Sequence, residues 1–340
     1  MLLNLFLVFV AAAVVEGAQG PCDILVAAGN PCVAAHSTTR ALYAKYDGPL
    51  YNVTRSSDGK SANVSVLEAG GFANITTHNL FCAKLDCVIS NVFDQSPQGN
   101  HLHQRHKLVN ASRHKITVGN GIHVYGMWFD PGYGYHVDNT TGIATGNDPE
   151  SIYAVMSGTH YNGACCFDYG NSETDDTSDG AGAMEAIYFG NAHWQGNTGA
   201  GNGPWVGADL EAGMYYGGGN ATKVNENNTP LPFEFVSLYL RGRTDGFVLK
   251  GGDATTGSLK TMYDGLRPDC AIAGTCHRHG NHTYQPMNKK GALILGTGGD
   301  NSNGAQGKFY EGIVVTGVTT DATDNAVQAN IVAVGYKNIA

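Results

Sequence analysis

Short runs of β-prone residues, separated by glycine- and asparagine-rich breaks, recur along almost the whole sequence. This spacing is typical of chains that form many short strands joined by turns and loops. With 14% charged residues and 47 glycines among 340, the composition suits a turn-rich β protein better than a helical one. We therefore predict an all-β fold, a two-sheet β-sandwich. The runs expected to be strands are Ile24–Ala28, Cys87–Asp94, His123–Phe129, Ile152–Met156, Met184–Phe189, Val206–Leu210, Phe233–Leu240, Phe247–Lys250, Ala292–Leu295 and Lys308–Thr316.

Two segments favour short peripheral helices instead. Ser37–Tyr46 begins with a hydroxyl residue suited to capping a helix, and Ala322–Tyr336 carries Val327, Ile331 and Val334 at i, i+4 and i+7. No Pro/Ser/Thr-rich linker, charge block or internal repeat divides the chain, so we predict one domain over residues 19–340.

The amino-terminal stretch predicts export. Residues 1–18 form a short apolar run ending in small residues, as in a secretory signal peptide, with cleavage expected between positions 17 and 20. No later segment is apolar and long enough to span a membrane, so a secreted, extracellular protein is expected. The formal charge of −9 argues against nucleic acid or anionic membranes as partners. Eight glycosylation sequons agree with export: Asn52, Asn63, Asn74, Asn110, Asn139, Asn220, Asn227 and Asn281.

The eight cysteines lie in short-range pairs, although 105 connectivities are possible. Nearest-neighbour pairing is the hypothesis: Cys22–Cys32, Cys82–Cys87, Cys165–Cys166 and Cys270–Cys276. Adjacent Cα atoms are about 3.8 Å apart whereas disulfides usually span about 4.4–6.8 Å, so a Cys165–Cys166 bond would close a small ring. Such a ring presents a flat, weakly polar surface suited to the apolar face of a sugar. The alternative is that each of these two cysteines pairs elsewhere.

Three acids are candidates for chemistry. Asp209 and Glu211 are two apart in a predicted strand, so their side chains would share one face. Asp300 lies in a glycine-rich loop directly after an apolar strand. Retaining glycosidases need two carboxyl groups about 5–5.5 Å apart, which a strand glutamate and a loop aspartate would supply. A solvated sheet edge or a calcium site is the alternative interpretation of these acids.

Several longer motifs resemble the catalytic domain of the fungal-type α-L-arabinofuranosidases of glycoside hydrolase family 54. The resemblance covers essentially the whole mature chain. The motifs that carry it are Pro21–Tyr43, Ala164–Asn171, Met184–Gly190, Ala208–Glu211, Gly298–Gly307, Phe309–Gly312 and Val327–Ala333.

The resemblance implies a concanavalin-like jelly roll that hydrolyses terminal L-arabinofuranosides with retention of configuration. It further implies that Glu211 is the nucleophile and Asp300 the general acid/base. The substrate-binding residues that it implies are Asp209, Trp194, Gly299 and the Cys165–Cys166 ring. The expected partner is a plant cell-wall polysaccharide or oligosaccharide such as arabinoxylan or arabinan, and a monomer without cofactor is expected.

Two departures from the family pattern bear on specificity. Ala212 stands where the family has an asparagine after the nucleophile, so one hydrogen bond to the sugar is expected to be missing. The family's carboxy-terminal β-trefoil module has no counterpart in this sequence, so we expect no polymer targeting of that kind. The main alternative function is a sugar-binding protein without catalysis, and a secreted wall glycoprotein is a further one. The His-x-His-x-x-His segments at 101–106 and 277–282 are expected to be polar loops without metal.

Overall fold

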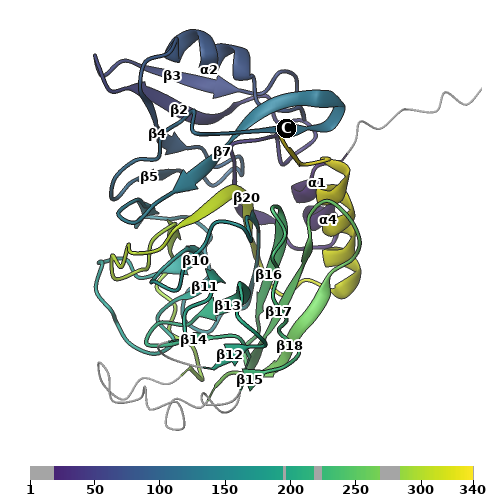
Figure 1. Ribbon diagram of the computed structural model, residues 1–340. Coiled ribbons are helices and arrows are strands. Elements are labelled where there is room, and N and C mark those ends of the chain that lie inside the picture. Colours follow the sequence, from purple (N-terminus) through teal and green to yellow (C-terminus); the bar gives the residue numbers. More distant parts are fainter. Residues whose placement is uncertain (1–18, 194–196, 218–223, 269–283, 340) are drawn as a thin grey trace, which may run out of the picture.

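The computed structural model describes residues 19–193, 197–217, 224–268 and 284–339 (Figure 1). Within them, two antiparallel sheets of nine and ten strands dominate. The first has the order β18 (Lys260–Leu266), β17 (Gly246–Asp253), β16 (Val236–Gly242), β9 (Glu150–Met156), β20 (Gly307–Thr316), β7 (Ile122–Phe129), β6 (His114–Val118) and β21 (Lys337–Asn338), with β1 (Cys32–Ser37) also on β20.

The second sheet contains the strands that carry most of the candidate site residues. Its order is β14 (Met214–Tyr215), β13 (Trp205–Asp209), β11 (Glu185–Gly190), β10 (Asp168–Ser172), β19 (Ala292–Leu295), β8 (Tyr135–Val137), β5 (Leu102–Gln104), β4 (Cys87–Val92), β2 (Pro49–Arg55) and β3 (Ser61–Ser65). The short strands β12 (Thr198–Gly199) and β15 (Val224–Asn225) pair in parallel. The helical segments are α1 (Pro21–Ala27), α2 (Ile75–Cys82), η1 (Gly119–Gly121) and α4 (Asp321–Ala333).

The core lies between the two sheets, which face each other in Figure 1. The ring of Tyr169 on β10 packs against Phe309 on β20, with centroids 5.3 Å apart. Gly312 on β20 makes room for that ring, since a Cβ there would lie 2.7 Å from Tyr169 Cζ. Strand β13 likewise contacts β17, and β11 contacts β16. The two-sheet β-sandwich predicted from the sequence is therefore confirmed.

The predicted carboxy-terminal helix is present as α4, although it ends at Ala333 rather than Tyr336. Val327 and Ile331 are fully buried or nearly so, which confirms the apolar stripe. Thr320 caps the helix through its hydroxyl, which accepts a hydrogen bond from the Thr323 amide at 3.1 Å. None of the helices in the described ranges has the length and apolarity needed to cross a membrane.

The prediction of a strand at Ile24–Ala28 was wrong, because this run lies largely in helix α1. A short apolar run is compatible with either state, and the local signals decide. Pro21 occupies the first helical position, and Asp23 accepts a hydrogen bond from the Gly20 amide at 2.8 Å. The Ala28 amide donates to the Ile24 carbonyl at 3.1 Å, the bonding pattern of a helix, and Leu25 is the buried member of the run while Val26 is exposed.

The prediction of a helix at Ser37–Tyr46 was also wrong. Ser37 ends strand β1, and its hydroxyl accepts hydrogen bonds from the amides of Thr39 and Arg40, so it caps a turn. The following amides are bonded to distant partners instead of to the preceding turn. The Leu42 amide, for example, donates to Gln95 Oε1 at 2.7 Å. Tertiary hydrogen bonds therefore replace the helical ladder here.

Candidate active site

Strand β13 delivers two acids to one end of the second sheet. The strand ends at Asp209, and Glu211 lies in the turn that follows, not on the strand as predicted. The Glu211 amide donates to Asp209 Oδ1 at 3.1 Å, which ties this turn to the Asp209 carboxyl group. Glu211 and Ala212 both have left-handed backbone angles, with φ of +57° and +47°. Such angles cost about 1–2 kcal/mol for a residue with a Cβ and tend to occur at functional sites.

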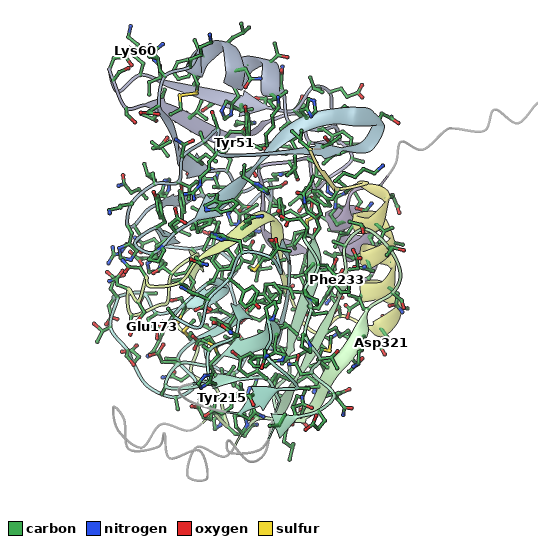
Figure 2. The ribbon with its side chains drawn as sticks, in the orientation of Figure 1. Tyr51, Lys60, Glu173, Tyr215, Phe233 and Asp321 are labelled. Carbon is green, nitrogen blue, oxygen red and sulfur yellow. A yellow bond between two sulfur atoms is a disulfide. The ribbon has the colours of Figure 1, made fainter. Side chains whose placement is uncertain are left out.

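Two further acids, which the sequence analysis did not single out, lie beneath this pair. Asp168 begins strand β10 and Glu173 directly follows it, and both are completely buried. Asp168 is within hydrogen-bonding reach of Asp209, and Glu173 is within reach of Glu211. Figure 2 shows Glu173 in the half of the molecule that contains β10, β11 and β13. Four carboxyl groups therefore gather at the ends of two strands of one sheet.

Burial makes it costly for these acids to be ionised together. Desolvation, followed by the charge of Asp209, raises the pKa of Asp168 well above its usual range. Desolvation and the charge of Glu211 likewise raise the pKa of Asp209. Burial and the contact with Glu211 raise the pKa of Glu173 to about 11. At neutral pH some of these carboxyl groups are therefore protonated, so the cluster has fewer negative charges than it has carboxyl groups.

Asp300 approaches the same cluster from the loop after β19. Its side chain is exposed, and its Oδ1 accepts a hydrogen bond from the Ser302 amide at 2.9 Å. A further bond from the Gly298 amide to the Ser302 carbonyl, 2.8 Å long, closes the turn. The charge of Asp300 acts on both Asp168 and Asp209, as does the charge of Glu211. Glu211 and Asp300 thus border the buried pair Asp168 and Asp209, of which Asp209 was also a candidate from the sequence.

Loops from elsewhere in the chain hold the Asp300 loop in place. Arg105 Nε donates to Asn301 Oδ1 at 2.9 Å and its guanidinium pairs with Asp176. The side-chain amide of Gln306 donates to the Tyr161 carbonyl at 3.0 Å, so it is engaged within the protein. Gly299 packs its backbone against Glu173, where a Cβ would lie 2.7 Å from Glu173 Cδ.

The adjacent cysteines form a disulfide next to the acids, as the nearest-neighbour hypothesis predicted. Their peptide bond is cis, and Cys166 Sγ lies 3.5 Å from Asp209 Oδ2. The Cys165 carbonyl accepts a hydrogen bond from the Gly304 amide at 2.8 Å, which joins the disulfide to the Asp300 loop. The sulfurs rest on a buried cluster of side chains: Tyr188, Ala192, Trp205, Met214 and Tyr216.

The remaining predicted pairs and sites are placed as follows. The disulfides Cys22–Cys32 and Cys82–Cys87 are present, whereas Cys270–Cys276 and Trp194 lie outside the described residues. His101 Nδ1 accepts a hydrogen bond from the Asp94 amide at 2.9 Å, and the second histidine segment is outside the described ranges.

Among the sequon asparagines, the six described ones are exposed or half-buried: Asn52, Asn63, Asn74, Asn110, Asn139 and Asn227. Asn220 and Asn281 lie outside the described residues.

Two sets of side chains among the described residues have the residue types of a metal site. The sulfurs of the first, Cys165 and Cys166 beside Asp209, are joined in a disulfide, and the second is His136, Asp138 and Asp176. The imidazole of His136 places Nε2 3.0 Å from Asp138 and Nδ1 3.3 Å from Asp176. The two carboxylates thus meet different ring nitrogens, so they do not converge on one point with it. Asp176 is also paired with Arg105. Asp138 and Asp176 are half-buried, and desolvation lowers the pKa of His136, so the buried imidazole lies between two partly exposed acids. Within the acidic segment 173–179, Glu173 is buried and Asp176 is half-buried, whereas Asp175 is exposed in a loop, as its composition suggests.

Several carboxyl groups gathered at one end of a sheet are the kind of residues that glycoside hydrolases use for catalysis. A family model described as "Alpha-L-arabinofuranosidase B, catalytic" matches residues 21–337. The chain belongs to this family of catalytic domains, which confirms the resemblance to glycoside hydrolase family 54.

Individual relatives agree with this family. The chain is 47% identical to a probable α-L-arabinofuranosidase B of Aspergillus terreus and 47% identical to an α-L-arabinofuranosidase of Hypocrea jecorina. Each match covers 94% of this chain and 63% of the relative, so the chain spans less than two thirds of their length.

Solved structures of the family superpose closely. An arabinofuranosidase complexed with arabinofuranosyl-α-1,2-xylobiose has a TM-score of 0.89 at 44% identity, covering 95% of this chain and 66% of that chain. A mutant of a family 54 α-L-arabinofuranosidase soaked with 4-nitrophenyl α-L-arabinofuranoside has a TM-score of 0.88 at 44% identity, covering 94% of this chain and 66% of that chain.

Proposed function

We propose that this protein is a secreted, retaining exo-α-L-arabinofuranosidase that releases terminal L-arabinofuranose from arabinoxylan, arabinan and related oligosaccharides. The observation that carries the proposal is the approach of Glu211 and Asp300 to one buried pair of acids beside the Cys165–Cys166 disulfide. A non-catalytic sugar-binding protein has no need of a second acid opposite the first. The family and the ligands named for its solved structures support this reading.

The proposed mechanism is a double displacement with Glu211 as nucleophile and Asp300 as acid/base. Glu211 attacks the anomeric carbon, the glycosidic C–O bond breaks, and Asp300 gives its proton to the departing oxygen. In the second step Asp300 takes a proton from water, whose oxygen attacks the same carbon and breaks the glycosyl ester. L-arabinose leaves with its configuration retained. The exposed position of Asp300 suits this role, because the leaving group and then water must both reach it.

Substrate binding is proposed to use the disulfide as the floor of the sugar subsite. A disulfide offers no strong hydrogen bond, so it suits the apolar face of the ring, and Asp209 at 3.5 Å from Cys166 Sγ then meets the hydroxyl edge. Gly299 would add a backbone contact, and Trp194 would line the pocket. Ala212 has no side-chain amide, so we expect weaker binding than in relatives with asparagine at this position.

Two substitutions test the catalytic roles. Glu211→Gln should abolish turnover of every substrate, because the amide cannot form the ester intermediate. Asp300→Asn should impair natural oligosaccharides far more than 4-nitrophenyl α-L-arabinofuranoside, whose leaving group needs little protonation. The assay is kcat/KM on both substrate types with purified protein. Equal losses on the two would refute the role given to Asp300, and an active Glu211→Gln variant would refute the role given to Glu211.

We also propose that the chain is exported and acts as a glycosylated monomer. Disulfides persist in oxidising compartments, and the apolar residues 1–18 supply the leader. Intact mass before and after enzymatic deglycosylation, with amino-terminal sequencing and light scattering, tests this. An uncleaved, unmodified protein recovered from the producing cells would contradict it.

A further inference from the structure

Glu173 is a buried acid that the proposed mechanism does not use. It follows strand β10 and is completely inaccessible to solvent. Oε2 accepts a hydrogen bond from Ser172 Oγ at 3.0 Å, while Oε1 meets no N–H or hydroxyl donor among the described residues. If Glu173 were ionised, only the hydrogen bond from Ser172 Oγ would compensate for its lost hydration. Burying a charge with so little compensation costs several kcal/mol.

The carboxyl group of Glu173 also faces the carboxyl group of Glu211. The two carboxyl groups are within hydrogen-bonding reach, and such a pair is stable only when one of them carries a proton. Glu173 is the more deeply buried, at 0% exposure against 7% for Glu211. Burial and the contact with Glu211 raise the pKa of Glu173 to about 11, so it is a neutral acid with an O–H to donate at neutral pH.

The Glu173 side chain also contacts the loop that carries Asp300. Gly299, the residue before Asp300, packs directly on the Glu173 carboxyl group, with space for no side chain between them. The ring of His136 on β8 lies near the backbone of Glu173. Glu173 therefore lies between the turn that carries Glu211 and the loop that carries Asp300.

We propose that Glu173 is a positioning residue that remains neutral and donates its O–H to the Glu211 carboxylate, while setting the separation between Glu211 and the Asp300 loop. This inference rests on the proposed function. A neutral donor in this position stabilises and orients an attacking carboxylate. Being neutral, Glu173 orients the nucleophile without placing a second negative charge beside it. The titratable groups that face it are Glu211 across the site and His136 at its backbone.

The test compares Glu173→Gln with Glu173→Leu. Glutamine keeps an N–H donor and cannot ionise, so it should keep kcat/KM within about threefold of wild type and leave the acidic limb of the pH profile in place. Leucine removes the donor. We expect kcat to fall at least about 30-fold with little change in KM, and the acidic limb to move up by about one pH unit. Glu150→Gln, a buried acid outside the site, is the matched control and should leave the profile unchanged.

Two results would overturn the inference. If Glu173 were ionised, Glu173→Gln would remove a repulsive charge, and the acidic limb would fall by about one unit or more. If Glu173→Leu behaved as wild type, no positioning role would remain. Should the leucine variant not fold, the glutamine profile alone still decides the first point.

A second readout separates this inference from the proposed function. If wild type hydrolyses no arabinofuranoside, the proposed function fails, but the state of Glu173 is still measurable. Unfolding at pH 7 should release about one more proton from wild type than from Glu173→Gln, because a proton held in the fold is lost from the exposed acid. Proton release is obtained from the pH dependence of unfolding stability. Equal release from the two proteins overturns the neutral Glu173.

Discussion

A single methyl group at Gly299 is predicted to disrupt the acid/base loop. In Gly299→Ala the new Cβ would lie 2.7 Å from Glu173 Cδ and closer still to the oxygens of Glu173 and Ser172. Carbon atoms in contact are normally about 3.5–4.0 Å apart, so one side must move by about 1 Å. Glu173 is fully buried beside Glu211 and has little room to yield. The loop, whose next residue Asp300 is exposed, moves instead.

A displacement of about 1 Å at a catalytic group costs about 100-fold in rate, or roughly 2.7 kcal/mol of transition-state stabilisation. The loss should fall on kcat more than on KM, and more on arabinofuranosyl oligosaccharides than on the 4-nitrophenyl glycoside, because Asp300 is the group displaced. The assay is steady-state kinetics on both substrate types, with thermal unfolding to confirm that the sandwich is intact.

Gly304→Ala is the matched control in the same loop. A Cβ at Gly304 would lie 3.3 Å from Ala164 Cβ and 3.5 Å from the Cys165 carbonyl oxygen, which a shift of a few tenths of an ångström relieves. This variant should keep its activity within about threefold. The reasoning is refuted if Gly299→Ala is as active as Gly304→Ala, or if both lose activity to the same extent.

Two further predictions concern groups around and away from the site. Arg105→Ala removes the bond to Asn301 Oδ1 and the pairing with Asp176. We expect kcat/KM on oligosaccharides to fall about tenfold, while the free energy of unfolding changes by about 1 kcal/mol or less. A variant with unchanged kinetics would contradict this. Burial lowers the pKa of His78 to about 4, below its usual 6.5, so the folded state binds fewer protons and stability is lost as pH falls from 6.5 through 4. His78→Gln should flatten the slope of unfolding free energy in that window by up to about 1.4 kcal/mol per pH unit, and an unaltered slope in urea titrations would count against it.

The sheets were predictable from sequence because their strands carry the pattern locally. Residues such as Ala292–Leu295 are apolar throughout and bounded by glycine, and they form β19 within the bounds expected. Ile24–Ala28 shows where this fails, since five apolar residues fit either state and the helix depends on Pro21 and Asp23 just before the run. Contacts at long sequence separation, such as the bond between Leu42 and Gln95, leave no local pattern at all.

The sequence pattern singles out Asp300, Cys165 and Cys166 as candidates for the site, but it does not single out the buried acid Glu173. Asp300 stands out because glycines surround it, and the doublet Cys165–Cys166 because adjacent cysteines are unusual. Glu173 opens a run of acids that has the composition of a solvated loop. Gly299, 126 positions further along the chain, packs on it and helps to cover it. Which acid in such a run is buried depends on that tertiary contact, so no spacing within the run reveals it.

Burial, rather than the number of acids, sets the charge of this site. Asp168 and Glu173 are completely inaccessible, and burial raises the pKa of each, which favours the protonated form beside Asp209 and Glu211. The donor role proposed for Glu173 follows from this protonated form. Asp300 is the exposed member of the group, and the acid/base role proposed for it requires proton exchange with water in every cycle. Placing the exposed acid on a loop and the protonated acids in the core therefore divides the proton-exchanging role from the positioning role, and Glu173→Gln and Asp300→Asn should affect different parts of the pH profile.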